Sequence, residues 1–87
     1  MSAFHVLVEV RLRPGIADPQ GATIERALPA LGFTGVHGVG VGKAIRFTVE
    51  AADEDHARRQ AEEMTERLLS NPVIEEAAID VRAVVAP

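Results

Sequence analysis

The chain has 87 residues, of which 47% are hydrophobic and 25% are charged, and its formal net charge is −4. These values are typical of one globular domain, which we place at residues 1–87. The nine basic residues are scattered, which argues against a nucleic-acid-binding protein. The lack of cysteine excludes disulfides and thiolate metal sites. Because no apolar run approaches the roughly 20 residues of a membrane span and no signal peptide is recognisable, we expect a cytoplasmic protein without a membrane partner.

The first predicted element is a strand over residues 4–13, because apolar side chains alternate there with mostly polar ones. Pro14-Gly15 ends this strand. The side chains that we expect to point inward are Phe4, Val6, Val8, Val10 and Leu12.

A helix with both ends marked follows. Asp18 is a good N-cap because its carboxylate can accept from free backbone amides two or three residues on, and Pro19 suits the first helical position. Gly32 can adopt the left-handed conformation that ends a helix. Pro29 lacks an N–H and clashes with the preceding turn, so we expect a kink or a distorted last turn around residues 27–31. The apolar stripe that we expect to be buried is Ile24, Leu28 and Leu31.

The glycine-rich segment Val36–Lys43 is predicted to be a strand with valines on one face and glycines on the other. Residues 44–50 alternate again, so Gly42-Lys43 is predicted to be the two-residue turn of a hairpin. The glycines would permit close backbone approach, either by a partner chain or within the domain. They do not form a phosphate loop, because a Walker A motif would need glycine at position 37, which is His, and Ser or Thr at position 44, which is Ala.

A second helix is predicted between the N-cap Asp53 and Asn71-Pro72, because asparagine tolerates the left-handed conformation and proline cannot continue a helix. Residues 77–85 alternate and are predicted to form the last strand. The expected buried stripe of the helix is Ala57, Ala61, Met64 and Leu68. Its outer face offers three i,i+4 ion pairs, namely Glu54–Arg58, Asp55–Arg59 and Glu63–Arg67.

The order strand–helix–strand–strand–helix–strand predicts an α+β fold. With right-handed crossovers it gives a ferredoxin-like βαββαβ sandwich, in which a four-stranded antiparallel sheet carries both helices on one face. The other face stays uncovered unless another subunit packs on it, and its mixed composition suits an interface, so we expect an oligomer. The residues placed on this outward face are Leu7, Glu9, Arg11, Arg13, Ala44, Arg46, Ala78, Asp80, Arg82 and Val84.

No group of side chains matches a catalytic, cofactor-binding or metal-binding pattern. No serine or threonine lies in a nucleophile-like context. Asp18 is better explained as a cap than as a general base. The helix start at Gln20-Gly21 can receive an anion, although a surface turn is the simpler explanation. The three histidines lack the spacing of a metal site; they are His5, His37 and His56.

Four short motifs occur in order along nearly the whole chain. They are Asp18-Pro19-Gln20-Gly21, Ala27-Leu28 with Leu31-Gly32-Phe33, Val41-Gly42-Lys43, and Leu68-Leu69-Ser70-Asn71-Pro72-Val73-Ile74-Glu75. In kind, spacing and order they resemble the PurS family, the small subunit of phosphoribosylformylglycinamidine synthase. Pro29 and the glycine-rich Val36–Gly42 segment depart from the family pattern.

The resemblance implies a non-catalytic subunit of a complex that converts formylglycinamide ribonucleotide to its amidine in purine biosynthesis. The complex uses ATP, magnesium and glutamine, and this chain itself is expected to bind no cofactor. Members of the family are dimers that bridge the glutaminase subunit PurQ and the synthetase subunit PurL and assist the passage of ammonia. For this chain a tetramer is the alternative to a dimer.

The resemblance also identifies motif residues that are expected to shape a docking surface. We assign them first to caps and turns, and only second to direct contacts with partner subunits. These residues are Asp18, Gly21, Gly32, Gly42, Lys43, Asn71 and Pro72, and the outward face adds Arg11 and Arg46. A different function stays open, because ferredoxin-like domains also act as dimeric small-molecule sensors. A sensor of that class would hold its ligand at the helix start, near Asp18–Gly21.

Overall fold

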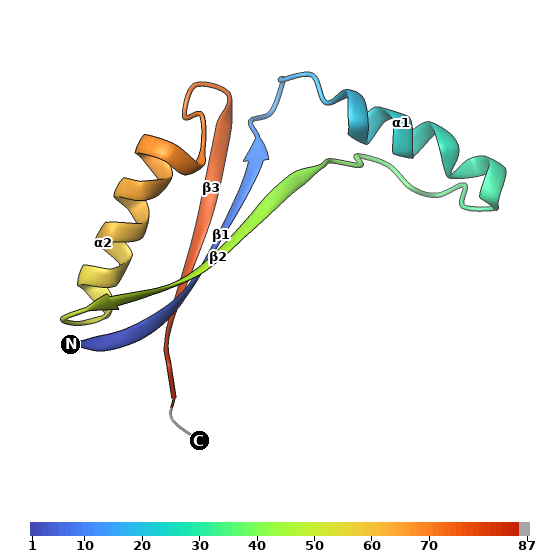
Figure 1. The fold of residues 1–87 in the computed structure, drawn as a ribbon. Helices are drawn as coiled ribbons and strands as arrows, with labels where there is room; N and C mark the ends of the chain where they lie inside the picture. Colours follow the sequence, from blue (N-terminus) through green and yellow to red (C-terminus); the bar gives the residue numbers. More distant parts are fainter. Residues whose placement is uncertain (86–87) are drawn as a thin grey trace.

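The structure is a computed structural model that describes residues 1–85. Three strands form one antiparallel sheet in the order β2-β1-β3, so β1 is central (Figure 1). Within these residues no helix is both long and apolar enough to cross a membrane. The elements in chain order are β1 (Ser2–Leu12), α1 (Pro19–Ala27), a 3₁₀ turn (Pro29–Leu31), β2 (Gly42–Ala51), α2 (Glu54–Met64), a π turn (Thr65–Leu69) and β3 (Glu75–Ala83).

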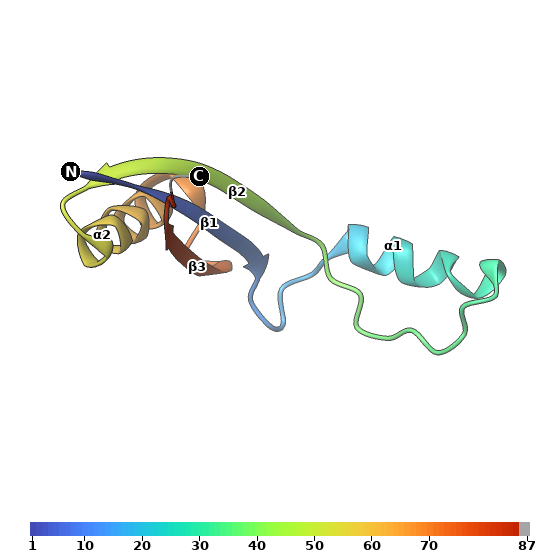
Figure 2. The same cartoon turned by 90° about the horizontal axis from the view of Figure 1, so that it is seen from below.

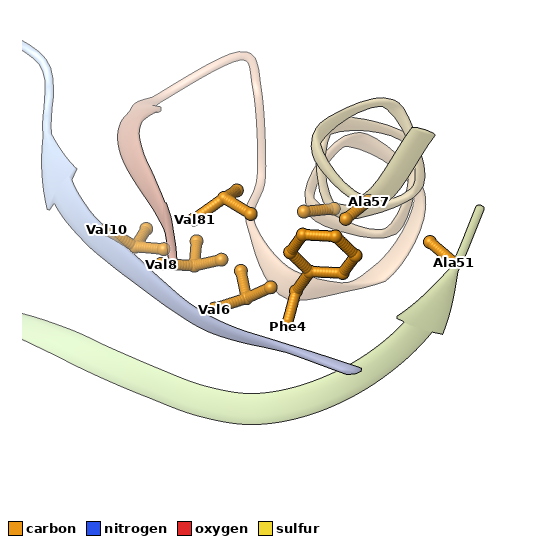
Figure 3. Close-up of a cluster of buried hydrophobic side chains, with 8 residues drawn as sticks. Phe4, Val6, Val8, Val10, Ala51, Ala57 and Val81 are labelled. Atoms are coloured by element: carbon orange, nitrogen blue, oxygen red, sulfur yellow. The ribbon is translucent and has the colours of Figure 1, made fainter. Parts of the chain in front are cut away.

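The core lies between α2 and one face of the sheet (Figure 3). The alternation predicted for β1 is confirmed, because four of its five expected inward residues are buried and Leu12 is half-buried. Ala57 and Ala61 of α2 are small, so the helix lies close to the sheet. Phe4 and the buried valines of the sheet pack directly beneath it. The buried apolar residues are Phe4, Val6, Val8, Val10, Ala51, Ala57, Ala61 and Val81.

The start of α2 is as predicted, but its end is not. Asp53 caps the helix, since its carboxylate accepts from the His56 amide at 2.8 Å. After Met64 the helix widens into the π turn, and this extra residue per turn rotates the following side chains. As a result Leu69 packs against the core, and the predicted burial of Leu68 is wrong, because that side chain is 81% exposed.

One of the three predicted ion pairs on α2 is present. Glu63 and Arg67 lie 3.0 Å apart, whereas the other two pairs are not among the ion pairs of residues 1–85. Arg58 instead donates to the Ile79 carbonyl at 3.1 Å and so links α2 to β3.

The α+β class is confirmed, but the predicted four-stranded ferredoxin-like sandwich is wrong. The described chain has three strands, and α2 is the helix that packs on them. Gly42 and Lys43 do not form a hairpin turn; they begin β2 and pair with Arg11 and Val10 of β1. Residues 36–41 run back beside α1 instead of forming a strand (Figure 1).

Residues 19–41, which we call the arm, extend away from the sheet (Figures 1 and 2). The predicted distortion at Pro29 is confirmed, because α1 ends at Ala27 and a 3₁₀ turn follows. Gly32 is left-handed as predicted, with φ 96°, and its amide donates to the Pro29 carbonyl at 3.0 Å. The predicted burial of Ile24 and Leu31 is wrong, because they are 45% and 71% exposed and α1 does not lie on the sheet.

Removing side-chain volume from the core beneath α2 should lower the stability of the fold. Val8 is completely buried, so Val8→Ala should lower the free energy of unfolding by roughly 2 kcal/mol, from lost apolar burial and the cavity left behind. Urea unfolding at one fixed protein concentration measures this loss. Val73→Ala is the control: Val73 is 81% exposed, so it should cost less than about 0.5 kcal/mol. Equal losses in both variants would contradict the assigned core.

Candidate functional site

Four of the seven motif residues lie around the point where the arm leaves the sheet, and we call this junction the arm base. It joins the end of β1, the start of α1 and the start of β2, and it contains Asp18, Gly21, Gly42 and Lys43. Gly32 does not belong to it, because it lies in the turn that ends the 3₁₀ segment. Beside Asp18 and Lys43 the surface has a hollow of about 350 Å³.

Asp18 holds two parts of the arm at once. Its Oδ1 accepts from the Gly21 amide at 3.0 Å, which is the predicted helix cap. Its Oδ2 accepts from the Val41 amide at 2.9 Å, which the sequence did not suggest. One carboxylate therefore fixes the start of α1 to the segment that leads into β2.

Gly21 is buried because the returning segment passes directly over it. A Cβ at this position would collide with the Val39 carbonyl oxygen and would lie 2.7 Å from Asp18 Oδ2. The absence of a side chain is thus what allows the close approach. The Gly21 amide already donates to Asp18, so the donor that the anion-binding alternative needs at this helix start is occupied.

Glu25 is a residue that the sequence reasoning missed. Its Oε1 accepts from the Val39 amide at 2.9 Å, so a second carboxylate of α1 holds the same segment. The signal was present, because Glu25 lies seven residues after Asp18 and therefore on the same side of a helix. Two acidic side chains two turns apart match two amides, at Val39 and Val41, on one side of an extended backbone.

The electrostatics of the arm base depend on the ionised carboxylate of Asp18. The hydrogen bond from Gly21, and then the one from Val41, hold the pKa of Asp18 below its ordinary value of 3.8, while partial burial acts in the opposite direction. These amides bind the charged form more strongly than the neutral form.

The Asn71-Pro72 motif lies against the end of β1. Arg13 donates from its amide to the Ile74 carbonyl at 2.8 Å and from its side-chain Nε to the Pro72 carbonyl at 3.1 Å. The left-handed conformation predicted for Asn71 is wrong, since no residue other than glycine in the described chain has positive φ. Its Oδ1 instead accepts from the Val73 amide at 3.2 Å, which forms a short side-chain turn.

Arg46 and Arg11 lie on the face of the sheet opposite α2, as predicted. The register places Leu7 of β1 between Arg46 of β2 and Asp80 of β3, and no helix within residues 1–85 covers them. The surface there has a hollow of about 320 Å³. Three side-chain contacts lie on this face: Arg11–Glu76 at 3.2 Å and His5–Thr48 at 3.1 Å join neighbouring strands, and Arg82–Asp80 at 2.9 Å lies within β3.

Over residues 1–85, no three His, Cys, Asp or Glu side chains are grouped in a way that suits a metal ion. The arm base and the sheet face opposite α2 present fixed charges and backbone groups on exposed surfaces. Such groups can orient a partner chain by electrostatic complementarity.

Asp18→Asn separates the two contacts of the carboxylate. Asparagine is as good a helix cap as aspartate, but its amide group has one acceptor oxygen, so the variant should keep the Gly21 contact and lose the Val41 contact. Asp18→Ala should lose both. Amide hydrogen exchange should therefore accelerate severalfold at Val41 in both variants, and at Gly21 only in Asp18→Ala. Unchanged exchange at Val41 in both variants would contradict the double contact.

The lowered pKa of Asp18 also predicts a pH dependence. Because the folded pKa lies below the unfolded one, the contact stabilises the arm above the unfolded pKa and is lost as pH falls through the folded pKa. The Val41 amide signal in NMR spectra should shift with a midpoint below 3.8. The transition should be absent in Asp18→Asn, which controls for the other carboxylates, and a midpoint at or above the ordinary value would contradict the prediction.

Comparison with known proteins places this geometry in context. The family model described as PurS: Phosphoribosylformylglycinamidine (FGAM) synthase matches residues 5–83. The PurS subunit of phosphoribosylformylglycinamidine synthase from Synechocystis sp. is 40% identical over 93% of this chain and 81% of the relative. The same subunit from Methanocaldococcus jannaschii is 37% identical over 93% of this chain and 98% of the relative.

Solved structures share the fold as well. The crystal structure of Methanocaldococcus jannaschii PurS matches with a TM-score of 0.84 at 35% identity, over 94% of this chain and 99% of that chain. A chain in the structure of PurLQS from Thermotoga maritima matches with a TM-score of 0.83 at 36% identity, over 97% of this chain and 100% of that chain. Sequence and fold agree over nearly the whole described length, and this chain therefore belongs to the PurS family.

Proposed function

We propose that this protein is the small, non-catalytic subunit of an FGAM synthase complex, a glutamine- and ATP-dependent ligase of purine biosynthesis. Its role is to bridge a glutaminase subunit, PurQ, and a synthetase subunit, PurL. The observation that carries the proposal is membership in the PurS family over residues 5–83. The match to a chain of the Thermotoga maritima PurLQS structure adds support for these partners.

The shape of the molecule supports a structural role in that complex. The chain measures 52 × 35 × 14 Å, with an arm at one end and an uncovered sheet face. Ammonia is a small molecule that protonates in water, so a complex must hold its two active sites together if ammonia is to arrive in reactive form. An elongated subunit with an arm at one end and an uncovered sheet face suits that task.

Further features belong to the same proposal. The protein acts as one domain over residues 1–87, works in the cytoplasm, binds no cofactor itself and associates with a second copy. The sensor alternative lacks support among the relatives described above, which are all named as PurS subunits or complexes containing them. The helix start that a sensor would use is also closed by the Asp18–Gly21 contact.

Reconstitution of the three subunits tests the proposal. Omitting this chain should abolish glutamine-dependent amidine formation, because ammonia released by the glutaminase no longer reaches the synthetase. The control is the same mixture supplied with an ammonium salt, which should retain synthetase activity. Glutamine-dependent activity that is unchanged without this chain would contradict the bridging role, and a ligand-induced rise in its melting temperature would then favour a sensor.

Lys43→Glu tests one candidate contact residue. Lys43 is the only lysine of the sequence, it is exposed, and it stands at the start of β2 beside the arm base. Reversal of its charge should weaken co-elution with the other two subunits while the circular dichroism and melting temperature stay unchanged. Lys43→Arg keeps the charge and is the matched control. Normal co-elution of Lys43→Glu would remove Lys43 from the candidate interface.

A further inference from the structure

Residues 70–74 join the π turn to β3, and we call them the connecting turn. Asn71 holds its backbone in place. The Asn71 carbonyl accepts from the amides of Ile74 at 3.1 Å and Glu75 at 2.8 Å. Its side-chain Oδ1 accepts from the Val73 amide, and its own amide donates to the Glu75 carboxylate at 2.6 Å. The backbone groups and the side-chain oxygen of Asn71 are therefore all used to fix one conformation of the turn.

The connecting turn is also tied to the elements on both sides of it. Arg13, which directly follows β1, donates to the Ile74 and Pro72 carbonyls. The amide and the hydroxyl of Ser70 both donate to the Thr65 carbonyl at 3.0 Å, and Thr65 is buried in the π turn. The turn thus stands at the end of the sheet where β1 stops, supported by the sheet on one side and by the helix end on the other (Figure 1).

This supported turn presents apolar side chains to solvent. Val73 is 81% exposed, and Pro72 beside it is exposed as well. An isolated exposed valine is common on protein surfaces, but this one stands on a backbone that is already fixed. Valine has one stiff side-chain torsion and proline is a ring, so burying them against a partner costs little conformational entropy. Preorganised apolar side chains of this kind suit an anchor in a protein interface.

A positive charge without a partner lies next to these apolar side chains. Arg13 is exposed and has no ion pair within residues 1–85. Its Nε donates within the turn, and the two terminal nitrogens of the guanidinium remain for a bidentate contact with a carboxylate. The carboxylates at the start of β3 are already engaged. Glu75 accepts from Asn71, and Glu76 pairs with Arg11 at 3.2 Å.

An apolar anchor beside an unneutralised charge determines the kind of partner that fits. A small anion would satisfy Arg13 but would leave Val73 and Pro72 in solvent. A second copy bound through a two-fold symmetric contact would bring the Arg13 side chains of both copies together, and their like charges disfavour that contact. A different protein, with an apolar pocket and a carboxylate at its rim, satisfies both features of the turn.

We propose that the connecting turn docks into one of the two larger subunits of the proposed complex. Pro72 and Val73 enter an apolar pocket of that subunit, and Arg13 pairs with an Asp or Glu carboxylate at the pocket rim. This inference rests on the proposed bridging function and identifies a docking element for it. The element is separate from Lys43, because Lys43 lies on β2 and the turn leads into β3, on the other side of β1.

Substitutions at Val73 test the anchor. The dissociation constant of this chain is measured by surface plasmon resonance with each larger subunit and with their mixture. Val73→Asp should raise it about tenfold or more for the mixture and for the subunit that carries the pocket, and Val73→Ala should raise it severalfold. Val85→Asp is the matched control, because Val85 is 85% exposed and follows the opposite end of β3, so the constant should stay unchanged. All three variants should keep the wild-type circular dichroism and melting temperature, since these side chains are exposed.

Arg13→Gln tests the charge. Glutamine keeps a side-chain N–H that can donate to the Pro72 carbonyl but carries no charge, so the dissociation constant should rise severalfold. Because salt screens ion pairs, wild-type affinity should fall more steeply with ionic strength than that of Arg13→Gln. Arg59→Gln makes the same change at an exposed position of α2 and should behave as wild type.

Several results would overturn this docking element. Wild-type binding by both Val73→Asp and Arg13→Gln would do so, as would an equal loss of binding in Val85→Asp. Normal docking of Val73→Asp together with weakened self-association in sedimentation equilibrium would assign the turn to a contact between copies. Binding of inorganic phosphate that depends on Arg13, again with normal docking of Val73→Asp, would indicate an anion site instead.

The reconstituted activity separates this inference from the bridging function. If the wild-type chain is dispensable for glutamine-dependent amidine formation, the bridging function fails and the docking element fails with it. If the chain is required but the variants of the connecting turn bind and support activity as wild type, only the docking element is removed.

Discussion

The carboxylate of Asp18 determines the direction of the arm. Its two oxygens accept from amides that are 20 residues apart in sequence, at Gly21 and Val41. Glu25 and Asp18 accept from the Val39 and Val41 amides, so on that side of the segment these two donors are not available to a neighbouring strand. That side of the segment is occupied by side chains of α1 and its cap. The path of the segment that leads into β2 is fixed by these two contacts.

Gly21 leaves the space that lets the returning segment come close enough for the Asp18 contact. Any side chain there would meet the Val39 carbonyl, so the close pass of the returning segment depends on a missing methyl group. The period-two pattern of residues 36–42 predicted a strand, but residues 36–41 form none and Gly38 has a left-handed φ of 67°. What it could not indicate was the partner, because alternation is the same whether a strand or a helix carboxylate receives the amides.

The parts of the fold that the sequence predicted depend on near neighbours. The caps at Asp18 and Asp53, the left-handed Gly32 and the break at Pro29 are all decided within four residues, and all are confirmed. The failures depend on distant contacts or on local helix widening. The side chain of Leu68 misses the core because a π turn rotates it, and no propensity rule places such a turn. At Asn71 the predicted left-handed conformation is replaced by a side-chain turn to the Val73 amide, and Arg13 of the neighbouring strand end donates to the Pro72 carbonyl.

The two faces of the sheet differ in how they are covered and in the residues they present. On one face, α2 covers the buried residues of the core. On the opposite face, Leu7 of β1 lies between Arg46 of β2 and Asp80 of β3, and no helix of residues 1–85 covers them. Its mixed charge suits recognition that must be specific but reversible, because exposed ion pairs contribute more to orientation than to affinity.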